Sequence, residues 1–146
     1  MRFELIIDER AEETVTATVH RRSALTDELE ALVAQYIGAG RLMGYSRGEV
    51  RPLTFGDIDC IYVEAGHTYA ALSDGQRCQL RMRLYEAEQL LPGSFVRINK
   101  SAVGSLRRIE RFTSSVTGSV SVVFKGGYRD YVSRRCFPEI KRRLET

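Results

Sequence analysis

Short segments that alternate apolar and polar residues, separated by glycine-containing turns, are the feature that most limits the folds open to this chain. From residue 50 onward these segments follow one another closely, and such alternation is typical of half-buried strands. Asp74-Gly75 and Gly126-Gly127 have the composition of two-residue hairpin turns. We therefore expect a mainly β fold with short helices. The expected strands are residues 57–65, 68–73, 76–82, 95–98, 106–113, 119–125 and 128–132.

Two short helices interrupt this β pattern. The apolar spacing predicts the first over residues 84–91, and Pro92-Gly93 ends it. The second is expected over residues 134–144, with Ser133 as its N-cap and Pro138 in its first turn. Its buried side is expected to hold Cys136, Phe137, Ile140 and Leu144.

The start of the chain combines strand patterns with one helix pattern. Residues 2–8 and 14–20 alternate as strands do, and residues 42–46 can add a further short strand. Thr26 is expected to N-cap the helix between them, and Gly38 to end it. The helix is expected to bury one apolar stripe, formed by Leu25, Leu29, Leu32, Val33, Tyr36 and Ile37.

Length and the polar stretch at residues 46–49 suggest how the chain is divided. A chain of 146 residues accommodates one ordinary domain and a small appendage, but not two full domains. We expect a small β/α unit over residues 1–46 and a second, mainly β domain over residues 47–146. The fold class is then α+β overall.

The net charge of +3 conceals an uneven distribution along the chain. Residues 1–46 carry a net charge of −3, residues 47–96 of −2, and residues 97–146 of +8. Such asymmetry indicates an anionic partner for the last third, with nucleic acid the leading candidate. A basic face that is merely solvated is the structural alternative.

Cysteine usage and hydropathy indicate where the protein works. The three cysteines form no C-x-x-C pair, which argues against a disulfide framework or a zinc ribbon and favours the reducing cytoplasm. No apolar run approaches the roughly 18 residues of a membrane span, and the first residues contain no secretory signal. We expect a cytoplasmic protein.

Catalytic chemistry is poorly supplied. His20 and His67 are the only histidines, and neither lies in a motif that would pair it with a nucleophile. Metal-binding, Walker and dinucleotide-binding motifs are all absent from the sequence. We therefore expect no enzyme activity, no metal, no cofactor and no small-molecule substrate. Cys60 and Cys136 are expected to act as small buried apolar side chains.

Two polar segments of the basic third can bind an anion. With Ser133 as N-cap, Arg134 and Arg135 would lie in the first helical turn, where cations oppose the helix dipole. Free amide groups and two guanidinium groups would there form a phosphate or base-edge site. Asn99 and Lys100 follow an apolar anchor and can bond bases or phosphates, although a plain polar loop has the same composition. Lys141, Arg142 and Arg143 suit a helix C-terminus and are expected to be structural.

The order and spacing of six motifs resemble the LytTR DNA-binding domain of bacterial transcriptional regulators. The resemblance covers residues 51–144. Its motifs are D-I-D-C-I-Y-V-E-A at 57–65, L-Y-E-A-E-Q-L-L-P at 84–92, F-V-R-I-N-K-S at 95–101, the strand at Ile109, the Gly126-Gly127 hairpin, and Y-V-S-R-R-C-F at 131–137.

The resemblance implies antiparallel sheets whose loops, and not a recognition helix, enter the major groove of DNA. Matched position by position, it implies that His67, Lys100 and Arg135 read bases. It further implies that phosphate or support contacts come from Arg97, Asn99, Ser101, Ser133 and Arg134.

This chain departs from the family pattern at two places. Residues 102–106 lack the asparagine that often follows the motif serine, and Asn99 stands where the family often has histidine. Base preference therefore does not transfer from the family to this chain.

The resemblance also implies partners. Residues 1–46 are too few for the receiver domain that is common in this family, so the chain looks like stand-alone LytTR regulators. Those are often encoded beside a small integral membrane protein. The N-terminal unit can dimerise the chain or receive a signal, or it can extend the core; a homodimer on paired DNA sites is the favoured interpretation.

Two function classes follow. The first is a sequence-specific regulator of transcription that binds double-stranded DNA. The alternative is an interaction module of the same shape, whose basic face docks an acidic or membrane-protein partner without reading DNA.

Overall fold

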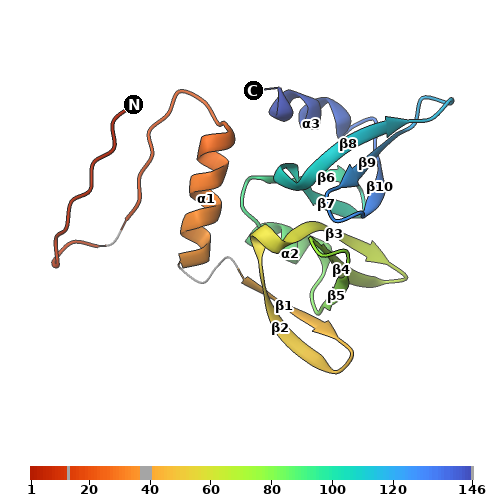
Figure 1. Cartoon of the computed structure of the whole chain (residues 1–146), viewed down its shortest axis with the longest axis horizontal. Coiled ribbons are helices and arrows are strands. Elements are labelled where there is room, and N and C mark those ends of the chain that lie inside the picture. Colours follow the sequence, from red (N-terminus) through yellow and green to blue (C-terminus); the bar gives the residue numbers. More distant parts are fainter. Residues whose placement is uncertain (13, 37–40, 146) are drawn as a thin grey trace.

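The computed structural model describes residues 1–12, 14–36 and 41–145, and strands make up the larger part of its regular secondary structure (Figure 1). The expectation of a mainly β fold with short helices is confirmed. In chain order the elements are α1 (Ala24–Tyr36), β1 (Arg41–Ser46), β2 (Glu49–Thr54), β3 (Ile58–Glu64), β4 (His67–Leu72), β5 (Arg77–Leu80), α2 (Leu84–Leu90), β6 (Phe95–Asn99), β7 (Ala102–Ser105), β8 (Ile109–Ser114), β9 (Val120–Phe124), β10 (Arg129–Val132) and α3 (Phe137–Leu144).

Seven strands form one antiparallel sheet in the order β2-β1-β5-β4-β3-β7-β6. The alternation did not predict β7, because all four of its residues are buried, Ser105 included, and apolar and polar residues do not alternate along it. Gly104 in this strand is needed for packing, since a Cβ atom there would lie 2.5 Å from the ring of Phe124.

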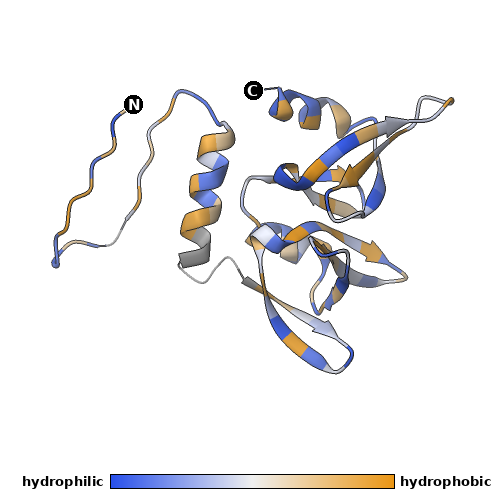
Figure 2. Ribbon diagram, in the orientation of Figure 1, coloured by the Kyte–Doolittle hydropathy of each residue, from blue (hydrophilic) through white to orange (hydrophobic). Residues whose placement is uncertain are grey.

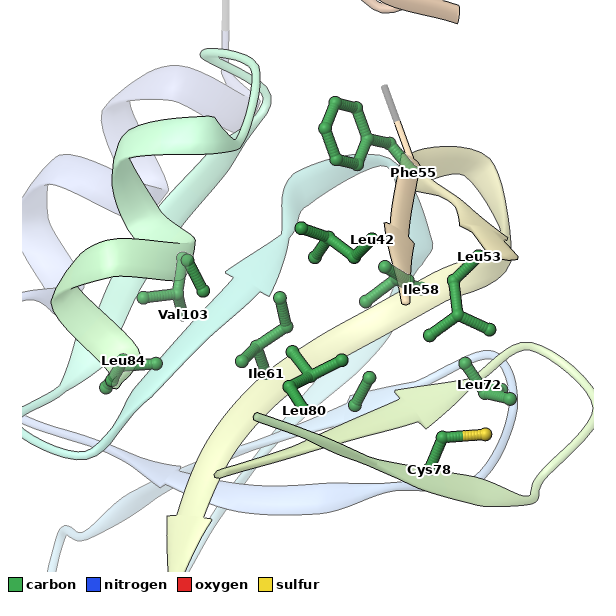
Figure 3. Close-up of a cluster of buried hydrophobic side chains, with 12 residues drawn as sticks. Leu42, Leu53, Phe55, Ile58, Ile61, Leu72, Cys78, Leu80, Leu84 and Val103 are labelled. Atoms are coloured by element: carbon green, nitrogen blue, oxygen red, sulfur yellow. The ribbon is translucent and has the colours of Figure 1, made fainter. Parts of the chain in front are cut away.

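β8, β9 and β10 form a second sheet, which packs against the first. Cys60 and Ile61 are successive residues of β3, so their side chains point to opposite faces of the large sheet. Ile61 belongs to a buried cluster on the face covered by α2 (Figure 3). Cys60 belongs to a second cluster, which includes Phe124 of β9 and Ile140 of α3. The first part of β3 is therefore buried on both faces, and it anchors the exposed end of the strand that leads into the β3–β4 turn.

The strands expected at residues 2–8 and 14–20 are not formed. Both segments are extended but exposed, and neither belongs to a sheet of the described chain. A strand needs a neighbour to bond its backbone, and an isolated pair of strands is marginal in water. The local pattern is thus correct for a strand, but one copy of the chain supplies no sheet beside it.

The helix expected near the N-terminus is present as α1, but it begins two residues earlier than Thr26. The Thr26 hydroxyl reaches back instead: its Oγ1 accepts from the Ser23 N–H at 2.9 Å and donates to the Ser23 carbonyl at 2.8 Å. The expected end at Gly38 lies outside the described residues.

The strand expected at residues 42–46 is present as β1, and it joins the large sheet. β1 pairs with β2 along its whole length and with β5 at Tyr45. The polar stretch at residues 46–49 is a hairpin turn, in which Arg47 and Gly48 have φ angles of 50° and 77°. The expected division after residue 46 falls inside this hairpin, and it remains a prediction.

Among the helices of the described ranges, none is both long and apolar enough to cross a membrane.

Candidate nucleic-acid interface

The β3–β4 hairpin exposes His67 at one end of the large sheet. Ala65 and Gly66 form the turn, with φ angles of 51° and 79° that suit a two-residue type I′ turn. His67 is therefore the first residue of β4, opposite Glu64, whereas the expected strands, residues 57–65 and 68–73, left it between them. The Nδ1 atom of its exposed ring lies 3.3 Å from Nε2 of Gln79, which holds the imidazole at the end of the sheet.

The β6–β7 turn exposes Lys100, and a hydrogen bond from Arg97 stabilises this turn. The Arg97 Nη1 atom donates to the backbone carbonyl of Lys100 at 2.8 Å. Its Nε atom is paired with the carboxylate of Glu88 on α2. The Arg97 guanidinium, on a side chain that is 35% exposed, is thus held by two groups of the protein, and the side chain of Lys100 is the cation that the turn offers to a ligand.

Asn99 ties the same turn to the second sheet. Its side chain is only 1% exposed. The Nδ2 atom donates to Asp130 Oδ1 at 3.1 Å and to the carbonyl of Tyr131 at 2.8 Å, while Oδ1 accepts from the Ser101 N–H at 2.8 Å. Of the two roles expected for Asn99, phosphate contact and support, this geometry fits support.

A third turn, residues 133–136, joins β10 to α3 and exposes Arg134 and Arg135. The Ser133 carbonyl accepts from the N–H groups of Cys136 and Phe137 at 3.1 and 3.0 Å. The Ser133 Oγ atom also accepts from the Cys136 N–H at 3.1 Å. This bonding closes a compact turn whose two arginines project into solvent.

The expectation that Ser133 N-caps α3 is wrong: the N-cap is Cys136. If Ser133 were the cap, Pro138 would lie beyond the first turn, where its ring would clash with the carbonyl four residues back. The helix therefore starts late enough to keep Pro138 in its first turn. Arg134 and Arg135 precede the helix, so the dipole argument for their function no longer applies.

Backbone hydrogen bonds bring the three turns to the same end of the protein. The Val63 N–H donates to the Ser101 carbonyl at 2.9 Å, which sets the β6–β7 turn beside the end of β3. The Ser133 N–H donates to the Ile98 carbonyl at 2.9 Å, which sets the β10–α3 turn beside β6. The turns that carry His67, Lys100 and Arg135 are therefore neighbours, although the residues are widely separated in sequence.

The cations of these turns are free to meet a ligand. Among the residues that the structure describes, no carboxylate pairs with the side chains of Lys100, Arg134 or Arg135. Arg77 nearby differs, because its Nη1 atom lies 2.6 Å from Oε2 of Glu64. Unpaired cations at the tips of fixed turns form a surface suited to an anion.

Asp130 supports this surface through hydrogen bonds, a role that the sequence analysis did not predict. Besides the bond from Asn99, it accepts a bond from the Tyr128 hydroxyl at 2.8 Å and one from the Tyr131 N–H at 2.8 Å. Burial, and then the bond to Asp130, raises the pKa of Tyr128 well above its ordinary value. The phenol therefore stays a proton donor at neutral pH.

The thiol of Cys60 is buried and neutral. Burial, followed by the charges of Asp130 and Asp59, raises the pKa of Cys60 well above its ordinary value, so the thiol stays neutral. Within the described ranges, His, Cys, Asp and Glu side chains do not gather in threes around a place for a metal ion.

Comparison with known proteins agrees with this arrangement. The family model of the LytTr DNA-binding domain matches residues 48–145. HTH-type transcriptional regulators of Staphylococcus aureus strains NCTC 8325 and COL are each 32% identical over 103 residues, covering 70% of this chain and 69% of theirs.

A solved structure has the same fold. The LytTr DNA-binding domain of a protein from Bacillus cereus, described as a methyl-accepting/DNA response regulator, superposes with a TM-score of 0.64 at 18% identity. The match covers 73% of this chain and 98% of that one. The family match, the relatives and the fold lead to one conclusion: the chain belongs to the LytTR family of DNA-binding domains.

Proposed function

We propose that this protein is a sequence-specific regulator of transcription that reads the major groove of double-stranded DNA with three turns. The carrying observation is the convergence of those turns at one end of the sheets, with the unpaired cations Lys100, Arg134 and Arg135 at their tips. The major groove is about 12 Å wide and admits a two-stranded β-ribbon. The β3–β4 hairpin has that form.

Each residue has a role in this proposal. His67, Lys100 and Arg135 read base edges, because each is exposed in or directly beside a different turn. Arg134 neutralises a backbone phosphate. The positioning residues are Arg97, Asn99, Ser101 and Ser133, whose side chains or backbone groups make bonds within the turns.

The rigidity of the turns supports specific reading over loose electrostatic attachment. A side chain on a turn already held by hydrogen bonds loses less conformational freedom when it binds. Lys100 projects from a turn that Arg97 and Asn99 hold, and Arg135 from a turn that Ser133 closes. No catalytic step, metal or cofactor is part of the proposal.

The proposal includes a bacterial setting, a cytoplasmic location with the chromosome, and a homodimer on paired half-sites. The relatives named above are bacterial, which supports the first point. A two-fold symmetric dimer would match two half-sites in phase on the duplex. A small integral membrane protein encoded alongside remains an expectation from the resemblance.

Selection from a random pool of duplex DNA tests the proposal. We expect an enriched motif made of two half-sites in phase. Salt-sensitive binding without enrichment would overturn specific readout and favour the interaction module instead.

A further inference from the structure

Residues 2–8 and 14–20 expose apolar side chains that the rest of the described chain does not cover. We call residues 2–8 and 14–20 the N-terminal arm. Phe3, Leu5 and Ile7 alternate along its first segment and are 87%, 73% and 86% exposed, and Val15 in the second is also exposed. Figure 2 shows these apolar stretches on the far side of α1 from the two sheets. So much contiguous exposed apolar surface marks an interaction site in a stable protein.

α1 presents a second uncovered apolar surface, because it faces the sheets with its charged side. Asp27 is buried, and Glu30 Oε1 accepts from the Gly93 N–H at 2.7 Å, so this side of the helix contacts the domain. Leu25 and Leu32, two turns apart on another face, are 40% and 51% exposed, with half-buried Leu29 between them. A surface helix of a monomer normally buries its apolar stripe.

We propose that a second copy of this chain covers both surfaces, and that residues 2–8 of the two copies pair as antiparallel strands about a two-fold axis at Leu5. The sequence R-F-E-L-I-I-D is complementary to itself in this register. Arg2 of one copy lies opposite Asp8 of the other, and Phe3 lies opposite Ile7. Opposite charges and apolar side chains directly across an antiparallel pair stabilise it.

The turn within the arm lets each copy add a second strand. The Ala11 N–H donates to the Asp8 carbonyl at 3.2 Å, and residues 14–20 run back in the opposite direction (Figure 1). Two copies then supply four strands, with the leucine stripes of the two α1 helices to cover them. Two strands alone are marginal in water, but a sheet of three or more with a covered apolar face is not. This explains why a single copy leaves the arm extended and unpaired.

Charge disfavours DNA or a membrane surface as the occupant of the arm. Residues 1–13 contain five carboxylates and two arginines, a net charge of −3. This charge repels both DNA and the anionic surface of a membrane. A second arm carries the same net charge, but in this register the charged side chains that lie directly opposite each other, Arg2 and Asp8, have opposite signs, and this pair forms twice.

Pairing of the arms supplies an interface for the homodimer of the proposed function. Only the use of this dimer on DNA rests on that function. Sedimentation equilibrium of the full chain without DNA is the first measurement, and we expect a dimer. Leu5→Asp removes an apolar contact from each copy, so the dissociation constant should rise about a hundredfold or more. Val116→Asp, at an exposed site on the β8–β9 loop, is the matched control and should leave it unchanged. Leu5 is exposed in the single copy, so circular dichroism should show both variants folded.

Charge reversal tests the register. Arg2→Asp sets like charges opposite each other twice in its homodimer, and so does Asp8→Arg; each should weaken dimerisation about tenfold. In an equimolar mixture, the substituted position 2 of one copy faces the substituted position 8 of the other, so mixed dimers should recover the original affinity. If the variants weakened the dimer by disrupting the turn in which Asp8 accepts from the Arg10 N–H, mixing them would not restore the affinity.

A monomer at all concentrations, or a dimer that none of these variants affects, overturns the inference. Reversal variants that weaken the dimer but are not rescued by mixing overturn the register. Because no DNA is present, a failure of the selection experiment would leave these results standing. A monomer that still enriches a DNA motif would overturn the dimer alone.

Discussion

Asp27 of α1 and Arg143 of α3 form an ion pair, with Oδ2 and Nη2 3.0 Å apart, across 116 residues of sequence. Both side chains are largely buried, at 12% and 14% exposed. Arg143 Nη1 also lies in hydrogen-bond contact with the Gly93 carbonyl, and Arg22 adds a second bond to Asp27 at 3.0 Å. The N-terminal helix is therefore held on the β domain by a partly buried network of charges.

Asp27→Asn should loosen α1. The substitution removes the charge that two arginines share. The free energy needed to detach α1 from the domain should fall by about 2 kcal/mol. Hydrogen exchange should show faster exchange of α1 amides, while β3 amides stay protected. Glu28→Gln is the control, because its pair with Arg107 is exposed and 3.6 Å long, and it should change neither. Equal exchange in Asp27→Asn and the parent protein would contradict this role of the ion pair.

Lys100→Ala and Arg135→Ala should each cost roughly 1–3 kcal/mol of binding to a selected DNA site and relax specificity at one base position. Each substitution removes a base contact and leaves the turn bonding intact, since that bonding runs through the backbone and through other side chains. Binding titrations on the site and its single-base variants measure both effects.

Lys125→Ala removes an equal charge beyond β9, where it should cause only a small loss that is the same for all sequences. Unchanged affinity and specificity in both Lys100→Ala and Arg135→Ala would refute the assignment of these turns to DNA.

Asn99→Asp should destabilise the protein by about 3 kcal/mol or more, because it turns a buried donor into an acceptor that faces Asp130 and the Tyr131 carbonyl. Two carboxyl groups then share one site, so protonation of the pair should restore part of the stability as the pH falls. Urea unfolding at pH 7 and pH 5 measures the change. Ser101→Ala provides the comparison, since its backbone N–H still donates to Asn99 and its stability should barely change. A variant Asn99→Asp as stable as the parent at pH 7 would be inconsistent with the support role.

Tyr128→Phe should lower stability by about 1 kcal/mol at neutral pH, through loss of the hydrogen bond to Asp130. Above its ordinary pKa of about 10, tyrosine ionises in the unfolded chain. Burial and the Asp130 bond raise the pKa of Tyr128 in the folded state, so there it keeps its proton. The unfolded state thus binds fewer protons, and the free energy of unfolding should fall as the pH rises past 10.

Tyr128→Phe lacks this contribution, so the stability gap between the two proteins should narrow between pH 9 and pH 11 in urea unfolding. A gap that stays constant or widens would show that the phenol ionises normally in the folded protein.

The sequence predicted much of the fold, because local patterns carry that information. Alternation located most of the strands, and the glycine turns at residues 74–75 and 126–127 located two hairpins. The expected strands did not include β2 or β7, and in β7 burial on both faces removes the alternation. The start of α3 was also misplaced, although the constraint that Pro138 imposes is itself local.

The candidate site was predicted less completely. The charged residues of its turns stand out in sequence, and the resemblance added His67. Asp130 did not stand out, because its importance lies in bonds to Asn99 and Tyr128, and a lone aspartate in a strand has no distinguishing pattern.

The sequence by itself determined the strand segments, the basic last third and the residues that each turn exposes. Only the tertiary structure decided that the three turns meet at one end, that Asn99 is buried and Arg97 bonds the Lys100 carbonyl, and that residues 2–8 find no strand beside them in one copy. The physical reason is the range of the interactions. Alternation and turn geometry depend on neighbouring residues, whereas the bond from Asn99 to Tyr131 and the pair of Asp27 with Arg143 join groups 32 and 116 residues apart, and such partners leave no trace in the local pattern.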